Sequence, residues 1–209
     1  MKLDVFGKSV KGRSHERNED SFLIDANKNL FAVADGVSIP KNGGTASKKV
    51  ISLLSANFRG NLKESFLKVN ELLVKFLEEN LLEGYTTLTA VHFDKRISIC
   101  NVGDSPCFLI RKGKLVRLTN IDRGWDYPYL KQAMGERYII VHSKKENVEK
   151  GDVFVLMTDG VYDVLDEREI METVSRENAK KAVEKLIEAA EEKPKIYDDD
   201  KTVIVIKVV

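Results

Sequence analysis

Two similar stretches of sequence decide the fold: Phe31-Ala-Val-Ala-Asp35-Gly36-Val37 and Val155-Leu-Met-Thr-Asp159-Gly160-Val161. In each, a short apolar run ends at Asp-Gly, which is typical of a buried β-strand that stops at a turn. A single Asp-Gly is usually only a turn. However, aspartate is a poor strand former and is costly to remove from water, so its repetition at equivalent strand ends indicates a shared purpose.

Three further acidic elements stand at the ends of apolar runs. They are Asn18-Glu19-Asp20 before Ser21–Ile24, Gly103-Asp104-Ser105 after Ile97–Val102, and Asp198-Asp199-Asp200 before Thr202–Ile206. Carboxylates gathered at one sheet edge repel one another unless a cation neutralises them. Hard oxygen ligands suit Mg²⁺ or Mn²⁺. The pattern therefore predicts a divalent-metal site where the strand ends meet.

The remaining sequence predicts runs of strands followed by pairs of helices. The predicted helices are Thr45–Phe58, Leu62–Leu82, Glu167–Val174 and Asn178–Glu191. The predicted strands are Leu3–Ser9, Ser21–Asp25, Leu30–Ala34, Thr86–Phe93, Ile97–Val102, Cys107–Arg111, Lys114–Leu118, Arg137–Val141, Asp152–Met157 and Thr202–Val208. Residues 120–135 are predicted to form a loop with a short helix around Trp125. This order favours the α+β class over alternating βαβ units. We expect a four-layer α-β-β-α sandwich of two antiparallel sheets flanked by helices, in a single domain spanning residues 1–209.

Composition narrows the classes of partner. The net charge of +1 over 209 residues provides no basic or acidic excess, so neither nucleic acid nor an acidic membrane surface is expected as a partner. No apolar run approaches the ~20 residues of a membrane span, and the first residues lack the core of a signal peptide. Cys100 and Cys107 do not form a Cys-x-x-Cys pair and are predicted to be buried reduced thiols. These features favour a cytoplasmic monomer.

Seven motifs, in order, resemble the metal-dependent protein serine/threonine phosphatases of type 2C (the PPM family) in their compact prokaryotic form. The motifs are Asn18–Phe22, Val33–Gly36, Thr86–Leu88, Asn101–Ser105, Leu130–Gly135, Thr158–Asp163 and Asp199–Val203. Each motif is weak alone, but together they cover nearly the whole chain. The fold of that family is the sandwich expected above.

The resemblance implies two bound cations, Mn²⁺ or Mg²⁺, with a third held more weakly. It assigns Asp35 as the bridging ligand, Asp159 and Asp199 to the first cation, Glu19 and the carbonyl of Gly36 to the second, and Asp104 with Asp159 to the third. Asp20 would orient a metal-bound water. The implied reaction is hydrolysis of phosphoserine and phosphothreonine in a protein substrate of a serine/threonine kinase, by attack of a metal-bridging hydroxide.

The sequence departs from the family pattern around the substrate phosphate. Where relatives carry a phosphate-binding arginine, this chain has His15, with Arg13 and Arg17 nearby. We expect His15 to bind the phosphate and to act beside Asp35 and Asp20, with Arg13 or Arg17 as the alternative phosphate ligand. Because histidine is charged only below its pKa, phosphate affinity should then fall as pH rises.

Two further departures bear on activity. Val37 stands where some relatives have a histidine able to protonate the leaving group, and Asp200 replaces the usual asparagine. Two other functions therefore stay open: a phosphatase-like binding module with weakened catalysis, and a hydrolase of small phosphate esters. The acidic residues at all the main ligand positions favour the protein phosphatase.

Overall fold

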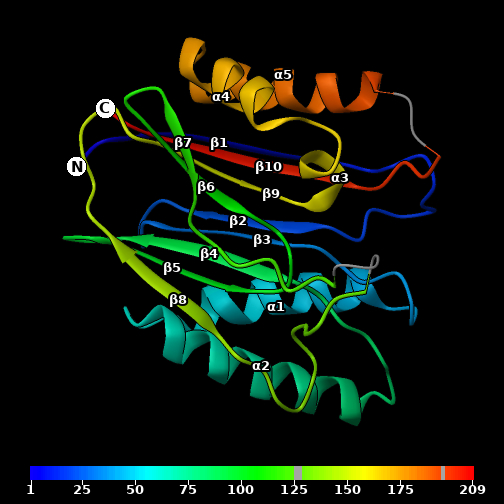
Figure 1. Cartoon of the computed structure of the whole chain (residues 1–209). Coiled ribbons are helices and arrows are strands. Elements are labelled where there is room, and N and C mark those ends of the chain that lie inside the picture. Colours follow the sequence, from blue (N-terminus) through cyan, green and yellow to red (C-terminus); the bar gives the residue numbers. More distant parts are fainter. Residues whose placement is uncertain (125–128, 194–195) are drawn as a thin grey trace.

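The computed structural model describes residues 1–124, 129–193 and 196–209, and these form four layers (Figure 1). Two five-stranded antiparallel sheets pack face to face, with helices on both outer faces. The predicted α-β-β-α sandwich is confirmed. It is the arrangement in which each sheet buries one face against the other sheet and the opposite face against helices.

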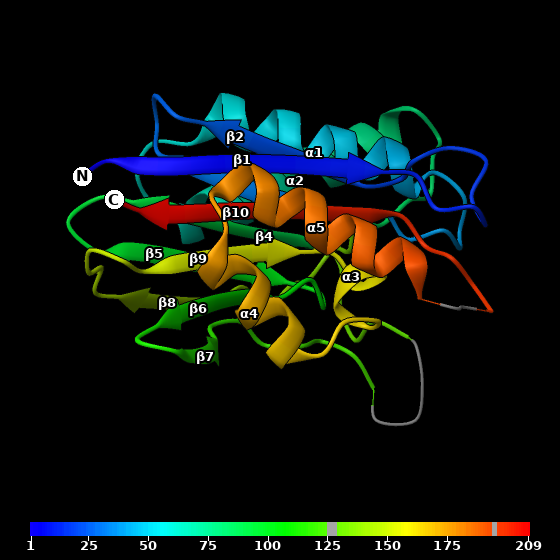
Figure 2. The same cartoon turned by 90° about the horizontal axis from the view of Figure 1, so that it is seen from above.

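The first sheet has the strand order β1-β10-β9-β6-β7. These strands are β1 (Leu3–Val10), β10 (Lys201–Val208), β9 (Val153–Met157), β6 (Cys107–Arg111) and β7 (Lys114–Arg117). Its outer face is covered by α4 (Glu167–Arg176) and α5 (Ala179–Glu192), while the short α3 (Asp159–Tyr162) lies at the end of β9. In Figure 2, α4 and α5 cross this sheet from above.

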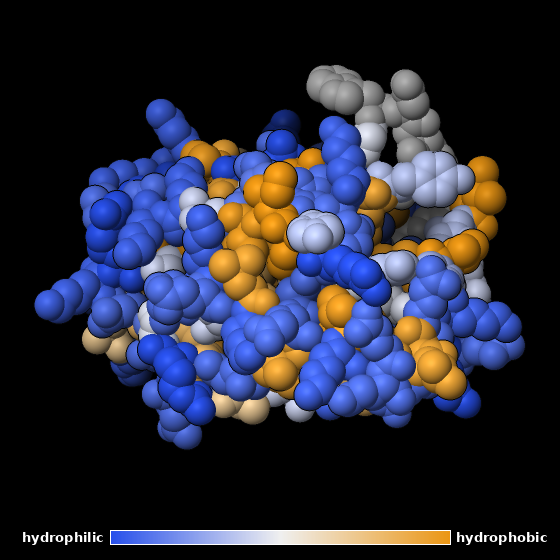
Figure 3. All heavy atoms as spheres, turned by 90° about the horizontal axis from the view of Figure 1, so that it is seen from below, coloured by the Kyte–Doolittle hydropathy of each residue, from blue (hydrophilic) through white to orange (hydrophobic). Residues whose placement is uncertain are grey.

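The second sheet has the strand order β2-β3-β4-β5-β8. These strands are β2 (Ser21–Asp25), β3 (Leu30–Ala34), β4 (Leu88–Phe93), β5 (Ile97–Val102) and β8 (His142–Glu146). The helices α1 (Gly43–Asn57) and α2 (Leu62–Glu79) cover its outer face. The surface on the α2 side of the molecule is largely hydrophilic, with separate apolar patches (Figure 3).

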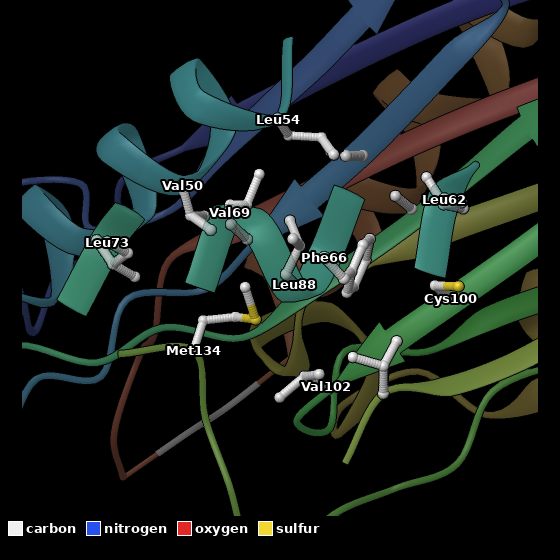
Figure 4. Packing of buried hydrophobic residues seen from close by; sticks show 14 of the residues in the cluster. Val50, Leu54, Leu62, Phe66, Val69, Leu73, Leu88, Cys100, Val102 and Met134 are labelled. Carbon is white, nitrogen blue, oxygen red and sulfur yellow. The ribbon is translucent and has the colours of Figure 1, made fainter. Parts of the chain in front are cut away.

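The sandwich explains why several strands are apolar at every position. In β3, Phe31 and Val33 point into the core between the sheets, whereas Leu30, Ala32 and Ala34 pack under α1 and α2. Both faces are buried, so the strand needs no polar alternation. Figure 4 shows how α2 contributes to the outer cluster, where Phe66, Val69 and Leu73 meet side chains from the sheet.

Helix ends follow the local sequence. The side chain of Asn61 accepts a hydrogen bond from the backbone N–H of Glu64 at the start of α2. Asp166 and Glu169 form a reciprocal capping box at the start of α4. Such side chains satisfy N–H groups that the first helical turn leaves without partners. This explains why the helix starts were close to their predicted positions.

The predicted strand Arg137–Val141 is wrong. The strand in this region is β8, five residues of polar sequence that pair with β5 at the sheet edge. The side chain of Gln132 instead forms hydrogen bonds with the backbone of Ile140. Its Oε1 accepts from the Ile140 N–H at 2.7 Å, and its Nε2 donates to the Ile140 carbonyl at 2.9 Å. An apolar run thus becomes a loop because a side chain satisfies its backbone.

The prediction of a short helix within residues 120–135 is also not confirmed. The described part of this segment, residues 120–124 and 129–135, contains no helix. Trp125 lies outside the described residues. Both cysteines are free and buried, as predicted. Among the residues that the structure describes, no helix combines the length and apolar character needed to cross a bilayer.

Candidate metal centre

The strand register brings the acidic elements together. In the β2–β3 pair, Ser21 lies opposite Ala34, so Asp20 and Asp35 leave the sheet side by side. In the β10–β9 pair, Val203 lies opposite Met157, which brings the chain before β10 next to Asp159. Face-to-face packing of the two sheets then joins the two pairs at one end of the sandwich.

Asp35 lies at the centre of this acidic cluster. Burial raises the pKa of its carboxyl well above the usual range, and the negative charges of Asp159, Asp20, Asp199 and Asp104 raise it further. The pKa of Asp159 is likewise raised well above its usual range, first by burial and then by Asp104 and Asp199. The five aspartates therefore share one electrostatic environment that disfavours their charged forms.

Among the residues that the structure describes, two buried carboxylate oxygens of the cluster have no hydrogen-bond partner. They are Oδ1 of Asp20 and Oδ1 of Asp159, and both are buried. The other oxygen of Asp20 is well satisfied, since it accepts from the hydroxyls of Thr158 at 2.8 Å and Thr202 at 2.6 Å. Buried carboxylate oxygens are rarely left unpaired in proteins. The donor set therefore fits a hard divalent cation with its bound waters.

Close backbone contacts hold the cluster in place. A Cβ atom at Gly36 would lie 2.4 Å from the carbonyl carbon of Gly43 and 2.6 Å from the carbonyl oxygen of Glu19. A Cβ atom at Gly160 would lie 1.9 Å from the carbonyl oxygen of Asp200. Only glycine permits such approaches, so the glycines of the two Asp-Gly pairs allow backbone segments to pack closely as well as allowing the chain to turn.

Comparisons with known proteins identify the family. The family model described as stage II sporulation protein E (SpoIIE) matches residues 44–209. This chain belongs to the SpoIIE family. Its domain is of the type 2C phosphatase kind, which confirms the resemblance found in the sequence.

Individual relatives of this SpoIIE-family domain are also named as protein phosphatases. The serine/threonine protein phosphatase PstP of Mycobacterium tuberculosis is 27% identical over 217 residues, which cover 90% of this chain and 42% of PstP. The probable protein phosphatase 2C BIPP2C1 of Oryza sativa is 26% identical over 164 residues, covering 76% of this chain and 29% of that protein. The chain thus spans less than half the length of these relatives.

Two solved structures match over nearly the full chain. The catalytic domain of PstP in complex with two manganese ions matches with a TM-score of 0.87 and 26% identity, covering 99% of this chain and 98% of that one. The phosphatase MsPP of Mycobacterium smegmatis in complex with cacodylate matches with a TM-score of 0.85 and 28% identity, covering 98% of each chain.

In this SpoIIE-family domain, His15 lies beside the cluster and is fixed by Asp200. His15 Nδ1 is 2.8 Å from Oδ2 of Asp200, while its Nε2 meets the Tyr197 hydroxyl and lies 3.3 Å from Ser38 Oγ. Burial lowers the pKa of His15, but the hydrogen bond and charge of Asp200, with the charges of Asp199 and Glu19, outweigh it, so the net pKa is raised. These surroundings therefore favour the positively charged form of His15.

Asp200 organises the loops around the predicted ligands. Its buried carboxylate accepts the backbone N–H of Gly12 at 2.7 Å and of Glu19 at 2.6 Å, in addition to its contact with His15. Asp200 thus ties the segment before β2 to the segment before β10, and it sets the position of Glu19, whose Oε2 accepts from Ser38 Oγ at 2.7 Å.

Asp104 has a partial counter-charge of its own. Arg123 Nε lies 3.6 Å from Asp104 Oδ2, and the same guanidinium binds both oxygens of Asp163, at 2.6 and 2.7 Å. Burial raises the pKa of Asp104 to about 6 against the lowering effect of Arg123. The sequence contained no signal for Arg123 at this site, because it lies in a loop outside every motif.

Arg13 points away from the cluster. Its side chain is 81% exposed, and its guanidinium contacts the carboxylate of Asp198 at 3.6 Å and the carbonyl of Glu191 at 3.4 Å. Arg17 is also exposed. His15 contacts Asp200 and Ser38 beside the cluster, whereas Arg13 contacts Asp198 and Glu191; the phosphate assignment itself stays a prediction.

Proposed function

We propose that this chain is the catalytic domain of a metal-dependent protein phosphatase that hydrolyses phosphoserine and phosphothreonine monoesters. The observation that carries the proposal is the set of buried and half-buried aspartates whose charges have no sufficient counter-charge from the described part of the chain, with unpartnered oxygens on Asp20 and Asp159. A cation removes that electrostatic cost, and the names of the relatives point to phosphate ester hydrolysis.

The proposed ligands follow the placement of the residues. Asp35 would bridge two cations, Mn²⁺ or Mg²⁺, with Asp159 and Asp199 on one and Glu19 and the Gly36 carbonyl on the other. Asp104 and Asp159 would hold a third, weaker cation. When bound, the cations supply an acidified water nucleophile and neutralise charge that develops on the phosphoryl oxygens.

The chain's own groups would hold and orient the reactants. His15, positioned through its Nδ1 by Asp200, presents Nε2 towards Ser38 and Tyr197, where it would bind the substrate phosphate in its protonated form. Asp20 is held by Thr158 and Thr202 through one oxygen, which leaves its other oxygen to accept a hydrogen bond from a water. Neither cysteine suits a nucleophilic role, since burial raises the pKa of Cys100 to about 12 and also raises that of Cys107.

The biological setting is also part of the proposal. The substrate would be a phosphoprotein made by a serine/threonine kinase, and the enzyme would act as a cytoplasmic monomer, in keeping with two buried free thiols and a near-neutral net charge.

A substrate panel tests the function directly. Wild-type protein is assayed with a phosphothreonine peptide, para-nitrophenyl phosphate, a sugar phosphate and a nucleotide, each with Mn²⁺, Mg²⁺ or EDTA. Metal-dependent turnover with the highest kcat/KM on the peptide supports the proposal. Preference for a small phosphate ester would favour the small-molecule hydrolase, and no turnover by folded protein would favour the binding module.

A further inference from the structure

A groove runs from the metal centre along the free edge of β2. It has a volume of about 1030 Å³ and is lined on one side by Arg17, Asn18 and residues 20–23, and on the other by one face of α1, including Lys48, Ile51 and Ser52. Asn18 and Asp20 line the end nearest the acidic cluster, and Lys28, in the turn after β2, lines the far end. The groove thus adjoins the site through Asp20, and none of the predicted metal ligands lines it.

One wall of the groove is an unpaired strand edge. β2 is the first strand in its sheet order and pairs only with β3 among the described residues. Figures 1 and 2 place it on the same side of the molecule as β1 and next to α1. Its outward backbone N–H and carbonyl groups form a row able to accept one more strand. Five residues of β2 match an extended segment about 17 Å long.

The charge of the lining indicates what kind of segment fits. Arg17 and Lys48 are exposed, and neither has an ion pair or side-chain hydrogen bond to the described part of the chain. Lys28 adds a third positive charge, although it also contacts Asp25 at 3.4 Å and the carbonyl of Ser55 at 2.6 Å. These cations line a path that begins beside an acidic cluster, where an acidic peptide would otherwise be repelled.

We propose that this groove binds an extended acidic segment of the phosphoprotein substrate, which adds as a strand to β2 while the phosphorylated residue enters the metal centre. The proposal rests on the proposed function and names its substrate class: phosphoproteins with a run of Asp or Glu on one side of the phosphorylated residue. Backbone pairing supplies affinity, and Arg17 and Lys48 select the charge.

Steady-state kinetics on matched peptides tests the proposal. Three phosphothreonine peptides are compared: one with four glutamates before the phosphorylated residue, one with four after it, and one with glutamines instead. One acidic placement should lower KM, because strand pairing has a direction. Lys48→Gln should raise the KM of that peptide about two- to fivefold, as expected for one partly exposed ion pair, and leave hydrolysis of para-nitrophenyl phosphate unchanged. Lys75→Gln on α2 is the matched control and should change neither.

Backbone methylation of the favoured peptide separates strand pairing from charge attraction. Two peptides are made, one N-methylated at the odd-numbered amides and the other at the even-numbered amides. One of them loses the N–H donors that face β2, and the other keeps those donors. One methylated peptide should show a KM at least threefold above the other. Equal KM values for both methylated peptides, equal effects of both acidic placements, or no effect of charge would each overturn the proposal. A dimer that pairs through β2, detected by sedimentation, would also overturn it.

Different results would refute the groove proposal and the proposed function. If no phosphate ester is hydrolysed under any metal, the catalytic proposal fails. Fluorescence anisotropy of labelled acidic and neutral peptides then measures whether the groove binds independently of turnover. Binding of the acidic peptide that weakens in Lys48→Gln supports the groove, and equal binding of both peptides refutes it.

Discussion

Asp152 and Asp159 flank the same strand, β9, but their carboxylates have opposite surroundings. Asp152, at the start, is 1% exposed and binds Arg111 through both oxygens, at 2.8 and 2.7 Å, while the backbone N–H of Glu149 donates to it at 2.7 Å. Asp159, at the end, has an unpartnered buried oxygen and lies among other aspartates. A buried carboxylate with a cation from the chain stabilises the fold, whereas one without such a cation marks a place for an external cation.

The largest expected effect on activity comes from removing the charge of Asp159 at the end of β9, in contrast to removing that of Asp152 at its start. Asp159→Asn should reduce Mn²⁺-dependent hydrolysis of para-nitrophenyl phosphate by about 10²-fold or more. The reason is that a bound metal contributes several kcal/mol of transition-state stabilisation, and the substitution removes a proposed metal ligand. Asp35→Asn should do the same. Asp152→Asn should leave kcat within about twofold. Similar losses in Asp152→Asn and Asp159→Asn would show that the two ends of β9 do not differ in function.

Stability should respond in the opposite order. Asp152→Asn should lower the free energy of unfolding by about 2 kcal/mol, since it removes a charge-assisted pair from a buried site. The partly exposed Arg111 then keeps its 3.5 Å contact with Glu149 and its hydrogen bond to the Asn147 carbonyl. Asp159→Asn should raise the Tm of metal-free protein at pH 7.5, because it removes one of several mutually repelling charges. Denaturant titration and calorimetry in EDTA measure both changes. A Tm loss in Asp159→Asn would contradict the account of the cluster.

The gain in stability from Mn²⁺ should grow with pH. Burial raises the pKa of Asp20 to about 7 and that of Asp104 to about 6. Carboxyls whose folded pKa is raised hold protons that the unfolded chain has released, so the stability they contribute is lost as pH rises through the folded value. Mn²⁺ replaces those protons. The Tm difference between Mn²⁺ and EDTA should therefore be larger at pH 8 than at pH 5.5, and it should shrink in Asp159→Asn at both pH values.

His15 should make substrate binding pH-dependent. Burial lowers its pKa, but the hydrogen bond and charge of Asp200 outweigh burial and raise the net pKa, so the imidazolium and its phosphate contact are lost as pH rises through the raised pKa of the folded protein. KM for a phosphate monoester should rise several-fold between pH 6 and pH 8. His15→Arg should keep KM low across this range, since arginine stays charged. A KM that does not change with pH in the wild type would remove His15 as the phosphate ligand.

The smallest effect is expected at Arg123. Its guanidinium partly compensates Asp104, so Arg123→Gln should increase the negative potential where the third cation is proposed. The Mn²⁺ concentration for half-maximal activity should fall about two- to threefold, within the range for a partly exposed charge pair. Titration of activity with Mn²⁺ measures the shift. An unchanged or higher Mn²⁺ requirement would argue against a cation beside Asp104.

Much of the site could be predicted because the information was local. The five acidic elements each adjoin a strand, and strand ends in a sandwich meet at a common edge, so the position of Asp35 and Asp159 at one end of the sheets could be expected from pattern, while their role as metal ligands stays a prediction. Helix starts were close for the same reason, since Asn61 and Asp166 cap them through contacts three residues away.

The misplaced strand shows where local information fails. Arg137–Val141 contains a continuous apolar run, yet Gln132 satisfies the backbone of Ile140 and the strand forms in the charged sequence that follows. A sheet edge tolerates polar residues on both faces, so hydrophobic pattern carries little signal there.

By itself, the sequence determined the layered fold and the presence of an acidic centre, because hydrophobic period and strand-end chemistry act over a few residues. Tertiary structure alone decided the partners over long separations: Asp200 with Gly12, Glu19 and His15, Arg111 with Asp152, and the open edge of β2 beside α1. Whether an aspartate supports the fold or awaits a cation depends on which charge lies within about 3 Å of its oxygens, and only the packed chain settles that distance.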